Sequence, residues 1–128
     1  MSAEPISRVT HVTVLVEDAD EALSWFTEKL GFTVEADEAF GDDDRWLTVA
    51  PPDQDDLEIV LMEAEENDAD RVGRGTMTVV RTRDCDAAHG TLTDRGVTFL
   101  SDPEPMPWGI SAVFVDLYGN PYNLLEPA

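Results

Sequence analysis

The sequence predicts an α+β fold in which one βαβββ unit occurs twice within a single domain, residues 1–128. The 128 residues, of which 42% are hydrophobic, suit one compact core. Strand-like and helix-like patterns follow one another in the same order in residues 8–64 and in residues 75–127, with a polar linker at 65–74. Two copies of one supersecondary unit in one chain indicate an internal repeat.

The first unit begins with a strand-like alternation of valine and threonine in residues 9–16. Residues 17–32 predict a helix that Asp18 or Asp20 caps and that Gly31 ends. One face of this helix is apolar and consists of Ala22, Leu23, Phe26 and Leu30. Three extended runs follow, in residues 32–40, 45–50 and 57–63.

The second unit repeats this order, with a strand at 76–82 and a helix at 84–97 that ends at Gly96. Its further strands are expected at 97–100, 111–117 and 121–127. The two units correspond at an offset of 65 or 63 positions, through the pairs His11 and Thr76, Gly31 and Gly96, and Leu61 and Leu124. Turns of unequal length account for the change of offset.

The chain carries 28 Asp and Glu residues against eight Lys and Arg, a formal net charge of −20. Such a surface repels nucleic acids and anionic lipids, so neither is expected as a partner. The acids are scattered over nearly every predicted surface, which favours a halophilic protein of a salt-rich cytoplasm over a cation site. A cytoplasmic location also fits the single cysteine, Cys85, the lack of an apolar run that could cross a membrane, and the lack of a secretory signal pattern.

Two stretches resemble the vicinal oxygen chelate superfamily, which includes glyoxalases, bleomycin resistance proteins and extradiol dioxygenases. They are "HVTVLVEDADEALSWFTEKLGFTV" and "WGISAVFVDLYGNPYNLLEP", and the second contains the Asp, the Gly-Asn-Pro turn and the final strand of the family's common ending. The resemblance covers nearly the whole chain. It implies that the two units form a curved mixed sheet around a cup, with the helices on the outer face. It is weak for function, because the superfamily supports many chemistries on one scaffold.

Strand alternation sorts the residues of this fold between the cup and the helix side. Apolar walls with a few convergent polar groups are typical of small-molecule sites. The expected ligand-binding residues are His11, Thr13, Trp46, Thr48, Glu58, Val60, Met62, Thr76, Thr78, Trp108, Phe114 and Asn123. The cup should also contain Leu15, Val80, Ala112 and Leu125, and the helix side Met77, Val79, Val113, Val115 and Tyr122. The alternative is that these residues are ordinary core.

The resemblance implies that metal-dependent members hold their ion at the positions of His11, Val60, Thr76 and Asn123. Valine has no ligand atom, and threonine and asparagine are poor ligands for a transition metal. We therefore expect no catalytic metal and no other cofactor. The alternation places Glu58 toward the rim and away from His11, so His11 is expected to hydrogen-bond a ligand near Asn123 and Thr76, or to act as a catalytic acid–base group.

Residues 103–110, "PEPMPWGI", join the second and third strands of the second unit. Three prolines restrict this segment and Gly109 permits a sharp turn, so Trp108 is expected to close over the cup as a lid. The alternative is that Trp108 packs against the sheet edge or a dimer partner. Cys85 begins the second helix, on the expected outer surface, and is interpreted as a small helix residue and not a nucleophile.

These observations favour a small-molecule-binding protein without a catalytic metal. The alternative is a glyoxalase-type lyase or isomerase, or a dioxygenase, that acts on a small organic substrate with His11 as its catalytic group. A third hypothesis is a homodimer whose cup is filled by its own side chains. The superfamily builds the cup either within one chain or across a dimer, so a small organic molecule and a second copy of the chain are the expected partners.

Overall fold

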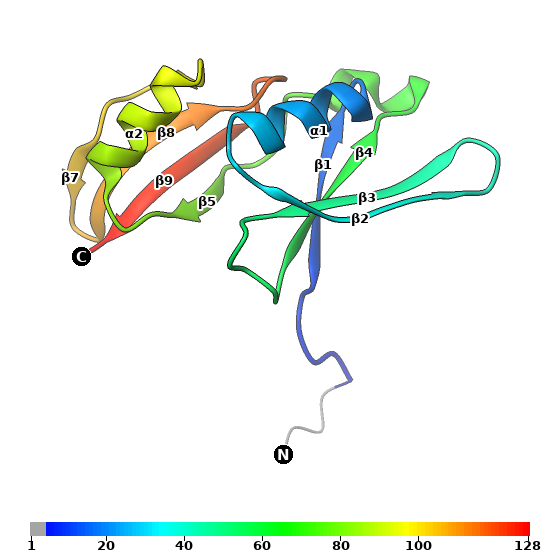
Figure 1. Ribbon diagram of the computed structural model, residues 1–128, viewed down its shortest axis with the longest axis horizontal. Coiled ribbons are helices and arrows are strands. Elements are labelled where there is room, and N and C mark those ends of the chain that lie inside the picture. Colours follow the sequence, from blue (N-terminus) through cyan, green and yellow to red (C-terminus); the bar gives the residue numbers. More distant parts are fainter. Residues whose placement is uncertain (1–4) are drawn as a thin grey trace.

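The computed structural model describes residues 5–128 and confirms the α+β fold with two βαβββ modules (Figure 1). The strands form two mixed sheets. Sheet A has the order β1-β4-β3-β2, and sheet B has the order β5-β9-β8-β6 with β7 beside β8. In both sheets the first strand of the module pairs in parallel with the last one, and the other pairs are antiparallel. Figure 1 shows each helix lying against its own sheet, with the two sheets side by side.

The first module follows the predicted order. It consists of β1 (His11–Val16), α1 (Ala19–Glu28), β2 (Thr33–Phe40), β3 (Asp44–Ala50) and β4 (Glu58–Glu63). Of the two predicted caps, Asp18 is the one used, because its carboxylate accepts a hydrogen bond from the Glu21 backbone N–H. Gly31 follows the helix with a φ of 73°, which favours glycine.

The sequence did not predict two elements, a 3₁₀ helix at Glu66–Arg71 in the linker and the strand β7 in the second module. The elements of this module are β5 (Thr78–Arg81), α2 (Cys85–Asp94), β6 (Thr98–Phe99), β7 (Glu104–Met106), β8 (Gly109–Val115) and β9 (Pro121–Pro127). The segment 103–110 is therefore a hairpin of β7 and β8 with Trp108 at its turn. Gly109 has a φ of 140°, and a Cβ there would collide with the Glu126 carbonyl.

Both helices bury their apolar faces in one continuous core. Phe26 of α1 lies edge-on to Tyr122 of β9, with ring centroids 6.4 Å apart, and Tyr122 stacks on Phe114 at 5.1 Å. The core includes Val16, Ala22, Leu47, Val49, Ile59, Leu61, Cys85, Leu92, Ala112 and Leu124. The contact of Phe26 with Tyr122 shows that the two modules of one chain meet through their helix sides.

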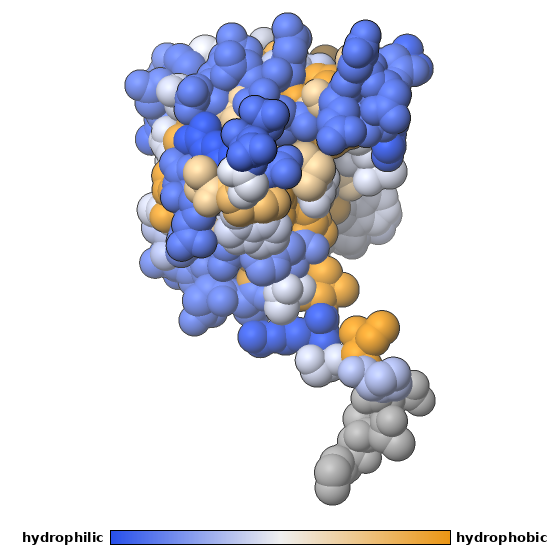
Figure 2. All heavy atoms as spheres, turned by 90° about the vertical axis from the view of Figure 1, so that its right-hand side faces the viewer, coloured by the Kyte–Doolittle hydropathy of each residue, from blue (hydrophilic) through white to orange (hydrophobic). Residues whose placement is uncertain are grey.

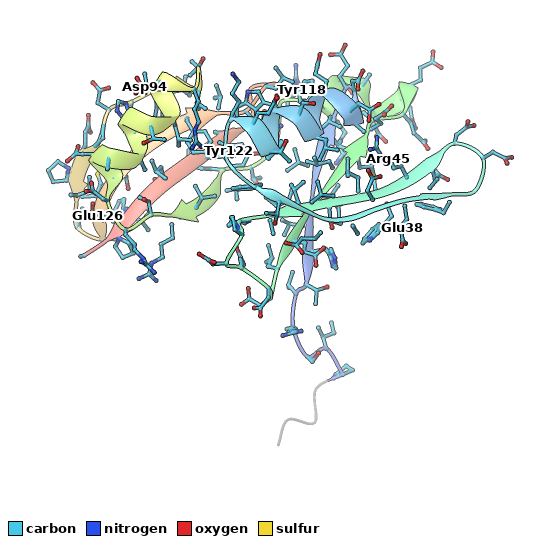
Figure 3. The ribbon with its side chains drawn as sticks, viewed as in Figure 1. Glu38, Arg45, Asp94, Tyr118, Tyr122 and Glu126 are labelled. Carbon is cyan, nitrogen blue, oxygen red and sulfur yellow. The ribbon has the colours of Figure 1, made fainter. Side chains whose placement is uncertain are left out.

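Tyr118, in the turn before β9, joins this turn to the start of α1 (Figure 3). Its hydroxyl oxygen lies 3.1 Å from the Asp18 carbonyl and 3.0 Å from a Glu21 carboxylate oxygen. Burial, together with the charge of Glu21, raises the pKa of Tyr118 to about 12. Nearby, burial and the Asp116 carboxylate raise the pKa of Tyr122, whose hydroxyl donates to Asp116 at 2.8 Å. The turn thus locks the second module onto the first.

Among residues 5–128, no helix is both long and apolar enough to cross a membrane.

Candidate functional site

The face of sheet A that α1 leaves uncovered is called here open face A. The predicted alternation in this module is confirmed, because Leu47, Val49, Ile59 and Leu61 lie in the core on the α1 side. Pairing across β1, β4 and β3 puts the intervening residues on open face A. They are His11, Thr13, Leu15, Trp46, Thr48, Glu58, Val60 and Met62.

His11, Trp46, Thr48 and Glu58 form one cluster at the start of β1. His11 and Glu58 are paired positions of β1 and β4, and His11 Nε2 lies 3.5 Å from Glu58 Oε1. The buried Thr48 hydroxyl donates to the same carboxylate oxygen at 2.6 Å. The Trp46 ring lies 5.2 Å from the imidazole and is 37% exposed. The cluster therefore offers an accessible aromatic surface beside a histidine–carboxylate pair.

One prediction about His11 is wrong. Glu58 does not lie away from it, because the parallel register of β1 and β4 pairs the two residues directly. Within one chain, His11 does not lie against Asn123 and Thr76: its described contacts are with Thr10, Trp46 and Glu58 of its own module. The sequence left open whether the cup forms within one chain or across a dimer, and within this chain the modules meet through their helix sides.

Open face A continues from this cluster toward the ends of β1 and β4. At those ends a hollow of about 580 Å³ is lined by Leu15 and Met62 of open face A and by residues of the α1 side, among them Ala19, Arg45 and Leu61. The Arg45 guanidinium is held by Asp37 and Asp20 at 2.8 Å and 2.7 Å, and it lowers the pKa of Asp37. Figure 3 shows Arg45 and Glu38 on the β2–β3 hairpin.

In sheet B the predicted alternation is wrong in two strands. Ala112 and Phe114 of β8 lie in the core and not in a cup, and Phe114 is only 1% exposed. Val80 of β5 packs against the same core, so Val79 is the residue of this pair that faces outward. Thr78 faces the α2 side as well, because it pairs with the buried Tyr122.

The reason for these errors is that β5 and β8 carry apolar residues on both faces. "TVVR" and "SAVFV" each give a hydrophobic pattern in either phase, so alternation alone cannot assign the core face. The phase of β9 settles the matter, because Tyr122 and Leu124 are buried on the α2 side and pair with Phe114 and Ala112. The sequence could have revealed the core faces of β5 and β8, because the core face of β9 is unambiguous and strand pairing extends it to both neighbours.

The face of sheet B away from α2 is called here open face B. It contains the apolar residues Val79, Val113 and Leu125, the polar residues Ser111 and Asn123, and two charged residues, Arg81 and Glu104. Sequence analysis identified Asn123 and Leu125 but missed Ser111, which the inverted phase of β8 had placed on the other side. Among residues 5–128, Ser111 Oγ and Asn123 Oδ1 are the buried side-chain polar atoms that lack a hydrogen-bond partner.

The four positions of the family's metal ligands do not fit a metal ion in this chain. Val60 contributes no donor atom, and Thr76 precedes β5 in a different module from His11. Within the described residues, no group of three or more His, Cys, Asp or Glu side chains gathers as a metal site. Of the residues that the structure describes, Glu58 is the carboxylate beside His11.

A larger cavity, of about 1200 Å³, lies between the two modules. Thr13, Thr76, Thr78 and Phe114 line it, but the His11 cluster does not. Its apolar wall includes Val12, Val14 and Leu124. Asp53 is the one acidic residue in its lining. Five of the chain's seven arginines surround it, namely Arg71, Arg74, Arg81, Arg83 and Arg95. This arginine-lined cavity is bordered by β1 and β5, which are the outer strands of their sheets.

Trp108 and Cys85 differ in exposure. Trp108 is 56% exposed, so in this chain it does not pack into the sheet edge, and its role as a lid stays a prediction. Cys85 lies inside the core and not on the outer surface that the sequence suggested. Burial raises the pKa of its thiol, which fits a small packing residue and not a nucleophile.

Comparison with known proteins shows the same family along nearly the whole chain. Residues 8–124 match the family described as Glyoxalase/Bleomycin resistance protein/Dioxygenase superfamily. The Bacillus subtilis (strain 168) protein YetH is 32% identical over 124 residues, which cover 94% of this chain and 99% of YetH.

Two solved structures are similar in both fold and sequence. TnmS3, an antibiotic binding protein from Streptomyces sp. CB03234, aligns with a TM-score of 0.84 and 34% identity, covering 98% of this chain and 99% of TnmS3. A superfamily member from Sphaerobacter thermophilus DSM 20745 aligns with a TM-score of 0.81 and 35% identity, covering 94% and 97% of the two chains.

Proposed function

The chain belongs to the glyoxalase/bleomycin resistance protein/dioxygenase superfamily, and we propose that it is a small-molecule-binding member that holds a planar organic molecule on open face A, against Trp46. The observation that carries this proposal is the accessible Trp46 ring beside His11, on a sheet face with no helix over it. Aromatic surfaces bind planar ligands by stacking, and a few polar groups then fix their orientation.

The ligand class that we propose is an antibiotic-like aromatic molecule. TnmS3, at 34% identity, is described as an antibiotic binding protein. The His11 imidazole offers a hydrogen bond to such a molecule, while Thr48 and Glu58 hold each other and keep the floor of the site in place. Met62, which is exposed on the same face, adds adaptable apolar surface.

A thermal-shift and calorimetric screen of aromatic antibiotics tests this function. We expect at least one planar compound to bind with a Kd in the micromolar range or below. Trp46→Ala should then weaken that binding at least tenfold, about 1.4 kcal/mol. Trp25→Phe, a change on α1 and outside open face A, is the matched control and should leave the Kd unchanged. If no aromatic compound binds, or if both variants weaken binding equally, the proposal is wrong.

We also propose that binding needs no catalytic metal, because Val60 supplies no ligand atom. Protein purified without chelator should contain well under one equivalent of zinc, nickel, manganese or iron by elemental analysis. Stoichiometric metal whose removal abolishes ligand binding or turnover would contradict this expectation.

A second candidate function is favoured by one specific contact. His11 and Glu58 lie 3.5 Å apart, and a carboxylate that holds an imidazole is a common arrangement for general acid–base catalysis. A glyoxalase-type lyase or isomerase, or a dioxygenase, would use such a group on a small organic substrate. His11→Gln separates the two functions: for a binding protein the Kd should stay within about tenfold of its original value, whereas an enzyme should lose turnover while binding persists.

We further propose that the protein is a homodimer in which open face A of one copy meets open face B of the other. Both β1 and β5 are edge strands, and unpaired edges promote pairing with another chain. Charge complementarity supports this arrangement, because residues 8–64 contain 16 acidic and three basic residues, whereas five arginines line the cavity beside β5.

Analytical ultracentrifugation tests the dimer. The double change Arg81→Glu and Arg83→Glu places acids where the partner's acidic module would dock, and it should shift the equilibrium toward monomer at least tenfold. The double change Arg8→Glu and Lys29→Glu alters the net charge equally and should have a smaller effect, since neither residue lines the cavity. A monomeric sedimentation coefficient at all concentrations would refute the dimer.

A further inference from the structure

The two unpartnered polar atoms of the described residues lie on one face of sheet B, and we propose that they form a subsite for a hydroxyl group of the bound molecule. This inference rests on the proposed function and on the proposed dimer, in which open face B of one copy meets open face A of the other. It adds a chemical requirement: the ligand should carry a hydroxyl that can both donate and accept a hydrogen bond. The subsite consists of Ser111 on β8 and Asn123 on β9.

The register places both residues on open face B. Ser111 pairs with Leu125, and Asn123 pairs with Val113, so the two polar residues are diagonal neighbours on adjacent antiparallel strands. Ala112, which follows Ser111, and Leu124, which follows Asn123, are buried in the core on the other face. Diagonal neighbours in a sheet have Cα atoms about 7–8 Å apart, which leaves room for one ligand oxygen between their side chains.

The energetic cost of these atoms calls for an explanation. A buried donor or acceptor without a partner costs about 1–3 kcal/mol, and folded proteins contain few of them. Ser111 is 6% exposed, and its hydroxyl has no partner. Val113 and Leu125 beside it on open face B are apolar, and no hydrogen bond joins it to Glu104, with which it pairs across β7. Elsewhere on the same sheet Ser101 accepts a bond from the Val113 backbone N–H, so an unpartnered serine is not the rule there.

The chemistry of the two groups favours a hydroxyl. Asn123 Oδ1 can only accept, so its partner must donate. The Ser111 hydroxyl can donate in turn to the ligand oxygen. A phenol or alcohol satisfies both groups at once, whereas an ether or a ketone cannot donate to Asn123. Each group turns on one or two side-chain torsions, and such a turn brings it to the surface of open face B.

Two probes test the specificity, one with a hydroxyl and one in which a methyl group replaces the hydroxyl proton. 2-Naphthol carries a donating hydroxyl, whereas 2-methoxynaphthalene has the same ring and can only accept. We expect isothermal titration to show that the protein binds 2-naphthol at least tenfold more tightly. Asn123→Leu, which keeps the approximate shape and removes the acceptor, and Ser111→Ala should each reduce this preference by at least threefold.

The stability of the free protein gives an independent readout. If the hydroxyl of Ser111 waits for a ligand, then Ser111→Ala removes an unpartnered group and should leave the melting temperature unchanged or raise it. The matched control is Ser101→Ala, which removes a hydrogen bond made within the protein and should lower the melting temperature. Opposite effects of Ser111→Ala on stability and on 2-naphthol affinity are the signature of a binding residue.

The outcomes separate this inference from the proposed function. Equal affinity of the wild-type protein for the two probes would overturn the hydroxyl subsite while leaving binding on open face A intact. A fall in melting temperature for Ser111→Ala equal to that for Ser101→Ala would also overturn it, because the hydroxyl would then have a permanent partner such as a bound water. If neither probe binds while an aromatic antibiotic still binds on open face A, the hydroxyl subsite is wrong and the proposed function stands, whereas the lack of any aromatic ligand overturns both.

Discussion

The two modules repeat one fold but differ in net charge and in whether the buried polar side chains of their open faces have partners. Residues 8–64 carry 16 acidic and three basic residues, whereas residues 75–127 carry seven and three. On open face A, the Thr48 hydroxyl donates to the Glu58 carboxylate, and the His11 imidazole lies 3.5 Å from the same oxygen. On open face B, Ser111 and Asn123 each retain a buried oxygen without a partner.

This difference indicates a division of roles between the halves of the proposed site. Open face A has a fixed polar network beside a large aromatic ring, which suits a preformed stacking platform. Open face B has two polar groups without hydrogen-bond partners among apolar residues, with Arg81 and Glu104 on the same face, which suits selection of a ligand by one hydroxyl. Figure 2 shows the surrounding surface of the first module as mostly hydrophilic, with smaller hydrophobic patches between.

The largest expected effect is on the free energy of unfolding, when a core aromatic and an aromatic of the open face are each replaced by alanine. Phe114→Ala should destabilise the protein by about 3–5 kcal/mol, because it empties a buried site against Tyr122. Trp46→Ala should cost about 1 kcal/mol, since its ring is more than a third exposed, yet it should abolish most ligand affinity. Urea unfolding measures both values, and equal destabilisation by the two changes would place Trp46 in the core as well.

Salt should stabilise the two modules unequally. The acidic charges of the first module repel one another more strongly when the Debye length is long, so raising KCl from 0.1 M to above 1 M should add about 2 kcal/mol, roughly 6–12 °C in melting temperature. Hydrogen exchange at low salt should show faster opening in β1–β4 than in β5–β9. A flat salt profile would contradict the halophilic interpretation, and uniform exchange would remove the contrast between the modules.

Deleting one buried hydroxyl from each open face makes the comparison direct. Thr48→Val removes a 2.6 Å hydrogen bond to Glu58 and should destabilise the protein by about 1–2 kcal/mol. Ser111→Ala should have no such cost. Chemical denaturation of both variants under identical conditions gives the answer, and a cost for Ser111→Ala that matches Thr48→Val would show that the two faces are alike.

The smallest expected effect concerns the turn that joins the modules. The folded pKa of Tyr118, about 12, lies above the value of about 10 for a free tyrosine, so its contribution is present below pH 10 and is lost as the pH rises toward 12. Tyr118→Phe should therefore cost about 1 kcal/mol at pH 8 and less at pH 11. A difference that does not change between these two pH values would show that the hydroxyl does not stabilise this junction.

Sequence patterns predicted most of the fold. The polar and apolar phases of β1, β3 and β4 were clear, because Leu47, Val49, Ile59 and Leu61 alternate with residues of different character. The caps and the terminating glycines also have local causes, so Asp18 and Gly31 could be placed without tertiary information. The strand β7 was missed because prolines at 103 and 105 favour a loop, although an edge strand tolerates them.

The site was harder to predict, because it depends on register and on how the modules meet. No local pattern shows that His11 lies opposite Glu58, since this pairing follows from the parallel register of strands that are distant in sequence. The apolar alternation of β8 fits either face, so the sequence analysis missed Ser111 and placed Phe114 in the cup. Within one chain, His11 does not lie near Asn123, because the modules pack helix side to helix side, as the contact of Phe26 with Tyr122 shows.

The central claim is that a planar molecule binds on open face A against Trp46. The most direct measurement is a titration of isotope-labelled protein with 2-naphthol, followed by ¹H–¹⁵N NMR in high salt. The account predicts that the Trp46 indole N–H and the backbone amides of β1 and β4 shift most, together with those near Ser111 and Asn123, while the Trp25 indole on α1 stays in place. Shifts centred on Trp25, or on the five arginines of the arginine-lined cavity, would contradict it.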